Sequence, residues 1–373
     1  MKGALAGVTV LDFTTLLPGP MATLMLAEAG AEVIKVERPG TGDDMRGYQP
    51  RFGDQSVNFA MLNRGKRSIA LDLKDPVERA RLMPLVDRAD VLIEQYRPGV
   101  MERLGLGYEA VSARNPGIVY CSITGYGQDG PKRDVAGHDL NYIGDAGLLS
   151  LSHGTPEQPV LPPALIADIA GGSYPAVVNI LLALRERDRA GHGCHIDVAM
   201  TEAVLPFAYW AIGGAMAVGK WPRSGGELVT GGSPRYHLYP TRDGRLVAAA
   251  PLEPKFWAAF CDCIGLEARW RDDAVDPAGT TARVAEIIAT ETAETWAPRL
   301  AAADCCCSIV RTLEEALDDP HFIERGLFAE RLADTGGDTI PALALPLARS
   351  LRARLGETLG APELGADNDA LLD

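Results

Sequence analysis

The chain has 373 residues, of which 47% are apolar and 23% are charged, as in an ordinary soluble globular protein. A single hydrophobic core rarely grows beyond about 250 residues, so this length predicts two domains. The net charge of −14 and the isoelectric point near 5.0 argue against a nucleic-acid-binding surface, although local clusters of basic residues could still bind an anionic ligand.

The apolar runs of the sequence predict neither a secretory leader nor a membrane-spanning segment. The stretch 199–219 comes closest to a span, but Glu202 interrupts it and its Gly and Ala residues make it weakly hydrophobic, so a buried helix is predicted there. The seven cysteines are too irregularly spaced for a disulfide framework or a zinc site. They predict reduced, mostly buried thiols in a cytoplasmic protein without a metal.

In the first half of the chain, apolar strands alternate with helical patterns, which predicts a parallel sheet covered by helices on both faces. The predicted strands are 8–13, 31–37, 68–74, 91–96 and 118–124, and the predicted helices are 18–29 and 76–89. The turn after the first strand reads Leu17-Pro18-Gly19-Pro20, with a single glycine. It therefore lacks the G-x-G-x-x-G fingerprint of a dinucleotide-binding site, and no NAD or FAD is expected.

The second half changes in composition and predicts a smaller α+β domain. Its predicted elements are an apolar helix at 172–187, a strand at 194–199, a Gly/Ser/Pro-rich linker at 219–233, a hairpin at 235–250 turning at Asp243-Gly244, and helices at 255–264, 281–290 and 292–303. The tail beyond residue 333 is expected to pack on the first domain. The predicted fold is thus α/β, with a Rossmann-like parallel-sheet domain, 1–218 completed by 326–373, and a small α+β domain, 219–325.

His138 stands between a polar loop and an apolar helix, in the sequence Gly137-His138-Asp139-Leu140-Asn141-Tyr142. Histidine is the side chain whose proton moves most easily near neutral pH, so His138 is a candidate acid or base. The plainer interpretation is a histidine at a helix start that bonds a neighbouring carboxylate such as Asp139, and the local sequence alone favours it. No pair of histidines has the spacing of a metal site.

Asp168 lies among apolar residues, shortly before Gly171 and Gly172, and two interpretations are equally supported. As a helix N-cap, an aspartate stabilises the helix by about 1 kcal/mol. As a functional group, its apolar surroundings raise its pKa, which suits a base or a nucleophile. The two glycines would then let a ligand approach the backbone, and free N–H groups at the helix start would bind a developing oxyanion.

Seven basic residues end or follow the predicted strands of the first domain or lie in the loops between them, and ligands of parallel sheets bind at the carboxyl ends of the strands. Arginines there could bind phosphates. At least half of the seven are nevertheless expected to be solvated surface charges that bind no ligand. The seven are Arg38, Arg64, Lys66, Arg67, Lys74, Arg97 and Arg103. Glu253, which precedes a predicted helix of the second domain, is explained locally by the helix dipole.

Short motifs along nearly the whole chain resemble those of the family III CoA transferases, the CaiB/BaiF superfamily, and of the 2-methylacyl-CoA racemases that share their fold. The order and spacing of the motifs carry the resemblance. The motifs are Leu17-Pro18-Gly19-Pro20, the run from Gly30 to Pro39, Asn63-Arg64-Gly65-Lys66-Arg67-Ser68, Tyr96-Arg97-Pro98-Gly99, Arg103-Leu104-Gly105-Leu106-Gly107, Gly125-Tyr126-Gly127-Gln128-Asp129-Gly130-Pro131 and Asp319-Pro320-His321.

The resemblance implies that Asp168 matches the aspartate used throughout the superfamily, a nucleophile in the transferases and one of two acid/base groups in the racemases. His138 separates the branches, because 137–142 matches the racemase pattern Gly-His-Asp-x-Asn-Tyr, whose histidine the transferases generally lack. Glu253 matches a racemase glutamate placed near the histidine and supplied by the partner subunit. The resemblance also implies an interlocked homodimer.

The implied substrate is an acyl-CoA thioester, with coenzyme A as part of the substrate and no prosthetic group. By this resemblance, Asp139 and Tyr142 would lie near the pantetheine arm of coenzyme A. The residues at or beside the positions that hold its nucleotide and phosphates are Arg38, Leu71, Lys74, Gln95, Tyr96, Arg97 and Arg103.

The favoured prediction is racemisation, in which His138 serves one face of the α-carbon, Asp168 serves the other, and Glu253 orients His138. The first alternative is CoA transfer with Asp168 as nucleophile. The glycine run of many transferases is represented here only by Gly225-Gly226 and Gly231-Gly232, which weakens that alternative. The second alternative is a non-catalytic acyl-CoA-binding protein, which the presence of both His138 and Asp168 disfavours.

Overall fold

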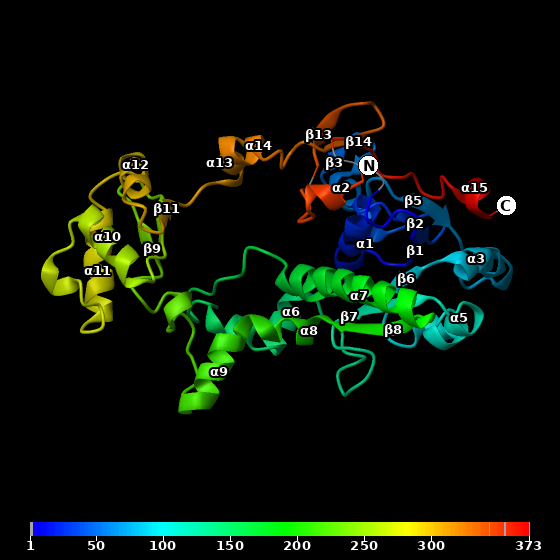
Figure 1. Cartoon of the computed structure of the whole chain (residues 1–373), viewed down its shortest axis with the longest axis horizontal. Coiled ribbons are helices and arrows are strands. Elements are labelled where there is room, and N and C mark those ends of the chain that lie inside the picture. The colour runs from blue at the N-terminus through cyan, green and yellow to red at the C-terminus, as the bar shows by residue number, and fades with distance from the viewer. Residues whose placement is uncertain (1–2, 343, 354–355, 373) are drawn as a thin grey trace. The chain divides into compact units, whose positions relative to one another are not determined.

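A computed structural model of the chain describes residues 3–342, 344–353 and 356–372 (Figure 1). These residues form two compact units. The first comprises the described residues up to Ala146, Ala164–Pro206 and those from His321 onward, and the second comprises Gly147–Pro163 and Phe207–Pro320. The predicted domain limits differ from these units chiefly in 147–163 and 207–218, which cluster with the second unit.

The first unit is built on a six-stranded sheet with the order β5-β2-β1-β6-β7-β8, in which every neighbouring pair is parallel. This confirms the parallel sheet predicted from the alternation of strands and helices. Strand β5 ends at Ala70, well before the predicted residue 74. The strands are β1 (Thr9–Asp12), β2 (Glu32–Glu37), β5 (Arg67–Ala70), β6 (Val91–Glu94), β7 (Val119–Thr124) and β8 (Cys194–Ala199).

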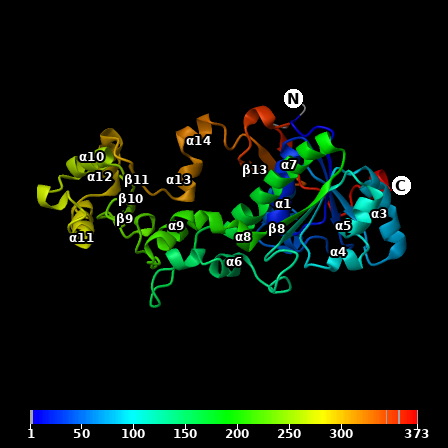
Figure 2. The ribbon, with the colours of Figure 1, turned by 60° about the horizontal axis from the view of Figure 1, so that its bottom comes forward.

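Helices cover both faces of this sheet. Helices α1 (Pro18–Glu28) and α7 (Tyr174–Ala190) pack together on one face, and α3 (Pro76–Arg88) and α5 (Tyr108–Arg114) pack together on the other (Figure 1 and Figure 2). Each of α1, α3 and α7 begins with a proline in its first turn, where the missing N–H has no partner to lose.

Successive side chains of the central strand β1 point to opposite faces of the sheet. Leu11 lies in the apolar core that α3 and α5 complete with Leu85 and Val111. Asp12, the next residue, points to the other face, where it accepts a hydrogen bond from Thr23 of α1 at 2.6 Å. Around β1, the face toward α3 and α5 is therefore apolar, and the face toward α1 carries buried charges.

The remaining helices and strands of the first unit are short. Those after residue 320 belong to a C-terminal segment that returns to the sheet. Asp367 binds Arg67 and the backbone of Ser68, and Arg352 pairs with the buried Glu28, which confirms the predicted return of the tail. These elements are β3 (Arg51–Phe52), β4 (Gln55–Ser56), α2 (Val57–Asn63), α4 (Val100–Arg103), α6 (Asp139–Asp145), α8 (Met200–Ala203), β12 (Arg331–Ala333), β13 (Thr339–Pro341), β14 (Thr358–Leu359) and α15 (Asn368–Leu372).

The second unit contains a three-stranded antiparallel sheet packed against three helices. The predicted hairpin is present, with Gly244 in the left-handed conformation at its turn (φ 78°). The elements are α9 (Tyr209–Val218), β9 (His237–Pro240), β10 (Leu246–Ala249), α10 (Pro254–Ile264), α11 (Pro277–Ile288), α12 (Ala293–Ala303), β11 (Cys307–Ile309) and α13 (Leu313–Leu317), followed by α14 (Pro320–Glu324).

The buried helix predicted at 199–219 is wrong. This stretch forms α8, a short 3-10 helix and α9, and only small side chains of α9, Ala211 and Ala215, are buried. Tyr209, Met216 and Val218 are each about three-quarters exposed (75%, 75% and 76%). Ala211 packs with the partly buried Trp210 and Ile212 in a small apolar cluster, while Tyr209, Met216 and Val218 of the same helix point outward.

By length and composition alone, two helical stretches could cross a membrane, Ala167–Ala190 and Met200–Val218. The first lies against α1, β7 and β8 of the first unit, as a core helix does. Both stretches contain charged residues, Asp168 in the first and Glu202 in the second, so neither is an uncharged apolar run. All seven cysteines are free, but Cys194 and Cys306 are exposed, so the predicted burial holds only for part of the set.

Candidate active site

The chain adds β2 and β5 on one side of β1 and then β6, β7 and β8 on the other, so the strand order switches direction at β1. In parallel sheets of this kind, ligands bind in the crevice beyond the carboxyl ends of the strands at such a point. A cavity of about 500 Å³ lies there, lined by Thr15–Pro18 after β1, Gln95–Pro98 after β6, and 124–126 after β7. His138 and Asp168 line the same cavity.

His138 precedes the first turn of α6, and its side chain is exposed. Its backbone N–H donates to Oδ1 of Asn141 at 3.0 Å, which fixes the start of the helix. The expected neighbouring carboxylate is engaged elsewhere, because Oδ1 of Asp139 accepts the backbone N–H of Asp168 at 2.9 Å. The same bond ties the segment that carries His138 to the segment that carries Asp168.

Asp168 is the second residue of a π-helical segment, Ala167–Ser173, that runs into α7. The N-cap interpretation is therefore wrong, since Ile166 holds that position. Burial raises the pKa of the Asp168 carboxyl to about 6, and the negative charge of Asp139 adds to this, while His138 acts in the opposite direction. At neutral pH the Asp168 carboxylate is therefore ionised, and its pKa lies close enough to the pH for it to accept a proton.

The two glycines after Asp168 do not admit a ligand. A Cβ on Gly171 would lie 2.7 Å from the carbonyl oxygen of Met200, and a Cβ on Gly172 would lie 3.0 Å from Cβ of Pro18. The glycines instead allow the segment to pack closely on α8 and on the start of α1. The predicted ligand approach through these positions is wrong, although both glycines are needed to place Asp168 at the cavity.

Tyr142 holds the loop of His138 in place. Its ring is buried between two glycines: a Cβ on Gly125 would lie 2.4 Å from the ring, and a Cβ on Gly137 would lie 2.6 Å from it. Its hydroxyl donates to the carbonyl of Gly137, and burial raises the pKa of Tyr142. The spacing of Gly137, His138 and Tyr142 therefore has a packing reason in addition to any chemical role.

A second cavity, of about 460 Å³, lies beyond the ends of β2 and β5. Apolar side chains such as Leu71 line it, and three basic residues, Arg38, Lys74 and Arg103, have exposed side chains at it. Tyr96 lines both this cavity and the first one, so the two adjoin. An apolar surface edged by cations is chemically suited to a planar base with attached phosphates.

The family model of CoA-transferase family III matches residues 5–368. The chain belongs to CoA-transferase family III. Human alpha-methylacyl-CoA racemase is 36% identical over 330 residues, which are 87% of this chain and 82% of that protein. The succinate–glutarate CoA-transferase of Agrobacterium fabrum is 35% identical over 367 residues, 94% and 90% of the two chains. The crystal structure of a CAIB/BAIF family protein from Brucella suis matches with a TM-score of 0.85 and 29% identity, over 100% of both chains.

In this member of CoA-transferase family III, Arg38 pairs with Asp44 at the surface and still lines the second cavity, whereas three other basic candidates pair with carboxylates and line neither cavity. Arg64 pairs with Glu28, and Lys66 pairs with Asp12, in both cases away from solvent. Arg67 pairs with Glu32 and Asp367. The prediction that these three residues could hold phosphates is wrong, because their charges are already neutralised within the fold.

Glu253 precedes α10 in the second unit and is exposed. Its role beside the histidine stays a prediction. Gln95 lines the first cavity and also braces it: its amide donates to the carbonyl of Thr15 at 2.6 Å and accepts the N–H of Gly19 at 3.0 Å. Among the described residues, no three His, Cys, Asp or Glu side chains gather as a metal site.

One buried carboxylate escaped the sequence prediction. Glu94 ends β6 directly before Gln95 and Tyr96, and burial raises its pKa to about 7, against hydrogen bonds from Ser122 and from the N–H of Tyr96. The carboxylate accepts the Tyr96 N–H at 2.8 Å and so shapes the loop between the two cavities. The sequence signal that could have identified Glu94 is an acidic residue at the end of an otherwise apolar predicted strand.

Proposed function

We propose that this chain is a 2-methylacyl-CoA racemase, which exchanges the α-proton of an acyl-CoA thioester through an enolate. The observation that carries the proposal is that an exposed imidazole, His138, and a half-buried carboxylate, Asp168, line one cavity at the carboxyl ends of the central strands. The match to human alpha-methylacyl-CoA racemase supports it.

The reaction needs one group to remove the α-proton from one face of the carbon and another to deliver a proton to the opposite face. An ionised carboxylate with a pKa of about 6 can accept the proton, while a protonated imidazole donates one. The C–H electron pair moves into the enolate and returns to the carbon when the second proton arrives. In the reverse direction the two groups exchange roles. By the resemblance to the racemases, Glu253 of the partner subunit would orient His138.

The second cavity would hold the nucleotide end of coenzyme A, with its phosphates at Arg38, Lys74 and Arg103. We expect Arg103→Ala to raise the Kd for coenzyme A about tenfold, since a charge-assisted phosphate contact is worth about 1.5 kcal/mol. Isothermal titration calorimetry measures this. Arg185→Ala, which removes an exposed arginine of α7, is the matched control, and an equal loss in both variants would contradict the assignment.

The central experiment uses one enantiomer of a 2-methylacyl-CoA in deuterated water. We expect one deuterium to enter at the α-carbon and the optical purity to fall at a comparable rate. A 2,2-dimethylacyl-CoA, which has no α-proton, is the control and should gain no label. If a panel of acyl-CoAs shows no exchange, the racemase proposal fails.

The alternative is CoA transfer with Asp168 as nucleophile, which the similarity to the succinate–glutarate CoA-transferase supports. It predicts an acyl or CoA adduct on Asp168, detectable by mass spectrometry, and movement of CoA between two carboxylic acids. Tight CoA binding with neither exchange nor transfer would instead indicate a non-catalytic binding protein.

We also propose that the active species is a homodimer. Three large apolar side chains of α9, Tyr209, Met216 and Val218, are each about three-quarters exposed in the single chain. Large exposed apolar side chains gathered on one helix support a protein–protein contact. Met216→Glu places a charge on this surface and should shift the protein toward the monomer. Sedimentation velocity measures the shift.

A further inference from the structure

The loop that joins β1 to α1 contains a leucine in a conformation that leucine rarely adopts. Leu16 has φ 61°, in the left-handed region, where its Cβ is crowded by the backbone. Among the described non-glycine residues, Asp304 and Cys306 are the others with positive φ, and only Leu16 lines the cavity of Asp168. Such a residue persists only when its surroundings hold it in place, and such positions cluster at functional sites.

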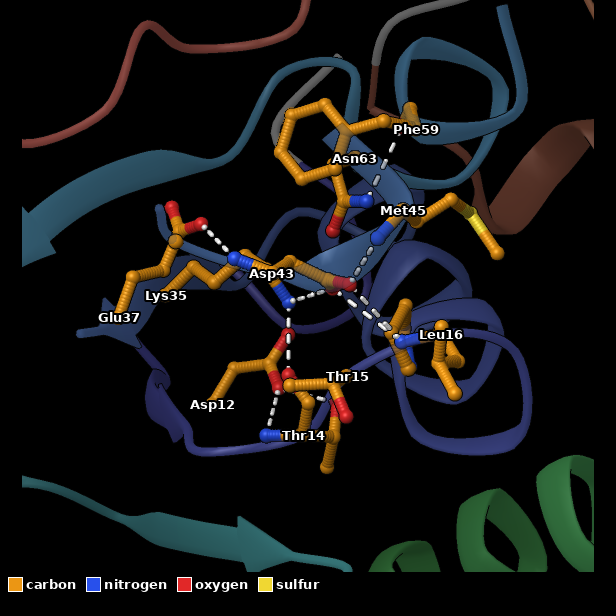
Figure 3. Close-up of polar contacts among 12 residues, drawn as sticks. Asp12, Thr14, Thr15, Leu16, Lys35, Glu37, Asp43, Met45, Phe59 and Asn63 are labelled. Carbon is orange, nitrogen blue, oxygen red and sulfur yellow. Dashed lines mark hydrogen bonds and ion pairs between the residues drawn. The ribbon is translucent and has the colours of Figure 1, made fainter. Parts of the chain in front are cut away.

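The surroundings that hold Leu16 centre on Asp43. Both carboxylate oxygens of Asp43 accept the N–H of Leu16, each at 3.2 Å, and Oδ1 also accepts the N–H of Met45 at 3.0 Å (Figure 3). Asp43 is itself fixed by the ammonium group of Lys35 at 3.0 Å, and this ion pair is fully shielded from solvent. Lys35 also donates to the carbonyl of Thr14 at 2.7 Å. The Lys35–Asp43 ion pair therefore binds the backbone on both sides of Thr15, at Thr14 and at Leu16.

A second buried ion pair holds the start of the same loop. Asp12 accepts the N–H of Thr14 at 2.9 Å and is paired with Lys66 at 3.2 Å. Asp12 and Lys35 are direct neighbours across the parallel strands β1 and β2, which brings the two pairs together. None of the four charged side chains is among the described linings of either cavity, so they cannot bind the substrate directly.

Four buried charges are not needed for stability, because well-packed apolar residues of the same volume serve as well or better. We infer that Asp43 is a positioning residue: through the N–H of Leu16 it holds the segment Thr15–Pro18, one wall of the cavity that His138 and Asp168 share, in a single shape. The inference rests on the proposed function only for its activity readout.

The test compares two double variants that both remove the Lys35–Asp43 ion pair and keep the Asp12–Lys66 pair. In Lys35→Met/Asp43→Leu no acceptor remains for the Leu16 N–H, whereas in Lys35→Met/Asp43→Asn the amide oxygen keeps one. We expect the leucine pair to lower kcat/KM for α-proton exchange about tenfold and also to lower thermal stability, because the N–H groups of Leu16 and Met45 lose their acceptor. We expect the asparagine pair to retain most activity. Equal activity in the two variants would overturn the inference.

A double-mutant cycle separates positioning from general damage. Glycine adopts a positive φ without strain, so in a Leu16→Gly background the leucine pair should cost no more than about threefold in kcat/KM. The same tenfold loss in both backgrounds would show that Asp43 does not act through Leu16.

Amide hydrogen exchange decides the inference independently of activity. Peptides covering residues 12–20 should exchange faster in the leucine pair than in the wild type, and at the wild-type rate in the asparagine pair. Unchanged protection in the leucine pair would reject the positioning role even in an active enzyme. If the wild type exchanges no α-proton, the proposed function fails, while the protection of 12–20 still tests the role of Asp43.

Discussion

Replacing His138 by glutamine is expected to lower the rate of α-proton exchange by about 10²- to 10⁴-fold, the usual contribution of a positioned acid or base. Glutamine has similar size and polarity but cannot carry a proton between two states. Because His138 is exposed and its backbone, not its ring, is tied to Asn141, the variant should fold normally. Asp168→Asn should have a comparable effect for the same reason.

The measurement is deuterium uptake at the α-carbon under single-turnover conditions. His192→Gln, at an exposed histidine in the loop between α7 and β8, is the matched control and should exchange at the wild-type rate. A His138→Gln protein that loses exchange but still moves CoA between acids would assign the transferase reaction to Asp168 alone. Full exchange in His138→Gln would remove His138 from the mechanism.

The same residues predict the pH dependence. Asp168 removes a proton only in its ionised form, and its pKa is raised by burial to about 6. The rate of proton removal by Asp168 should therefore fall about tenfold per unit as the pH drops below this pKa. A kcat/KM profile that stays flat down to about pH 5 would contradict the assignment of Asp168 as a base.

Replacing Lys66 by methionine should destabilise the protein by about 3–5 kcal/mol, the usual cost of removing one partner of a buried ion pair. The ammonium group of Lys66 has no exposed surface and contacts Asp12 at 3.2 Å, Thr23 at 2.8 Å and Asn63 at 2.8 Å. Burial lowers its pKa to about 8, and Asp12 partly opposes this. Lys66 and other groups keep the pKa of Asp12 at about 2, so both members are charged at neutral pH.

Urea unfolding at neutral pH measures the free-energy change. Lys74→Met, at an exposed lysine of the same unit, is the control and should change stability by less than about 0.5 kcal/mol. Because the loss comes from the unpaired Asp12 carboxylate, adding Asp12→Asn to Lys66→Met should recover part of it. If Lys66→Met behaves like Lys74→Met, the ion pair contributes nothing and the charged face of the sheet needs another explanation.

The sequence by itself determined the strands, most helices and the parallel sheet, because these follow from local patterns. A buried strand reads as a short apolar run wherever it lies, and a proline in the first turn marks a helix start without any tertiary information. The single glycine in Leu17-Pro18-Gly19-Pro20 likewise sufficed to exclude the dinucleotide fingerprint. For residues 137–142 and Asp168 the local sequence left the plain interpretation open, and the resemblance to the family made them the favoured candidates.

Only the tertiary structure decided which charges are buried. Arg38 and Arg64 both follow strand-like or helical segments, yet Arg64 is buried against Glu28, while Arg38 pairs with Asp44 at the surface and lines a cavity. The partner that buries Arg64 lies far away in sequence, so no local pattern encodes it. The outward-facing α9 was misjudged for the same reason, since burial depends on what packs against a helix.

The candidate site itself is also a tertiary product. His138 and Asp168 share a cavity because a hydrogen bond joins Asp139 to the backbone of Asp168 and because Gly171 and Gly172 permit close packing beneath it. The pKa of Asp168 depends on that burial and on the charge of Asp139, which are properties of the assembled fold. Sequence supplies the chemical groups, and long-range packing sets their distances, their exposure and therefore their reactivity.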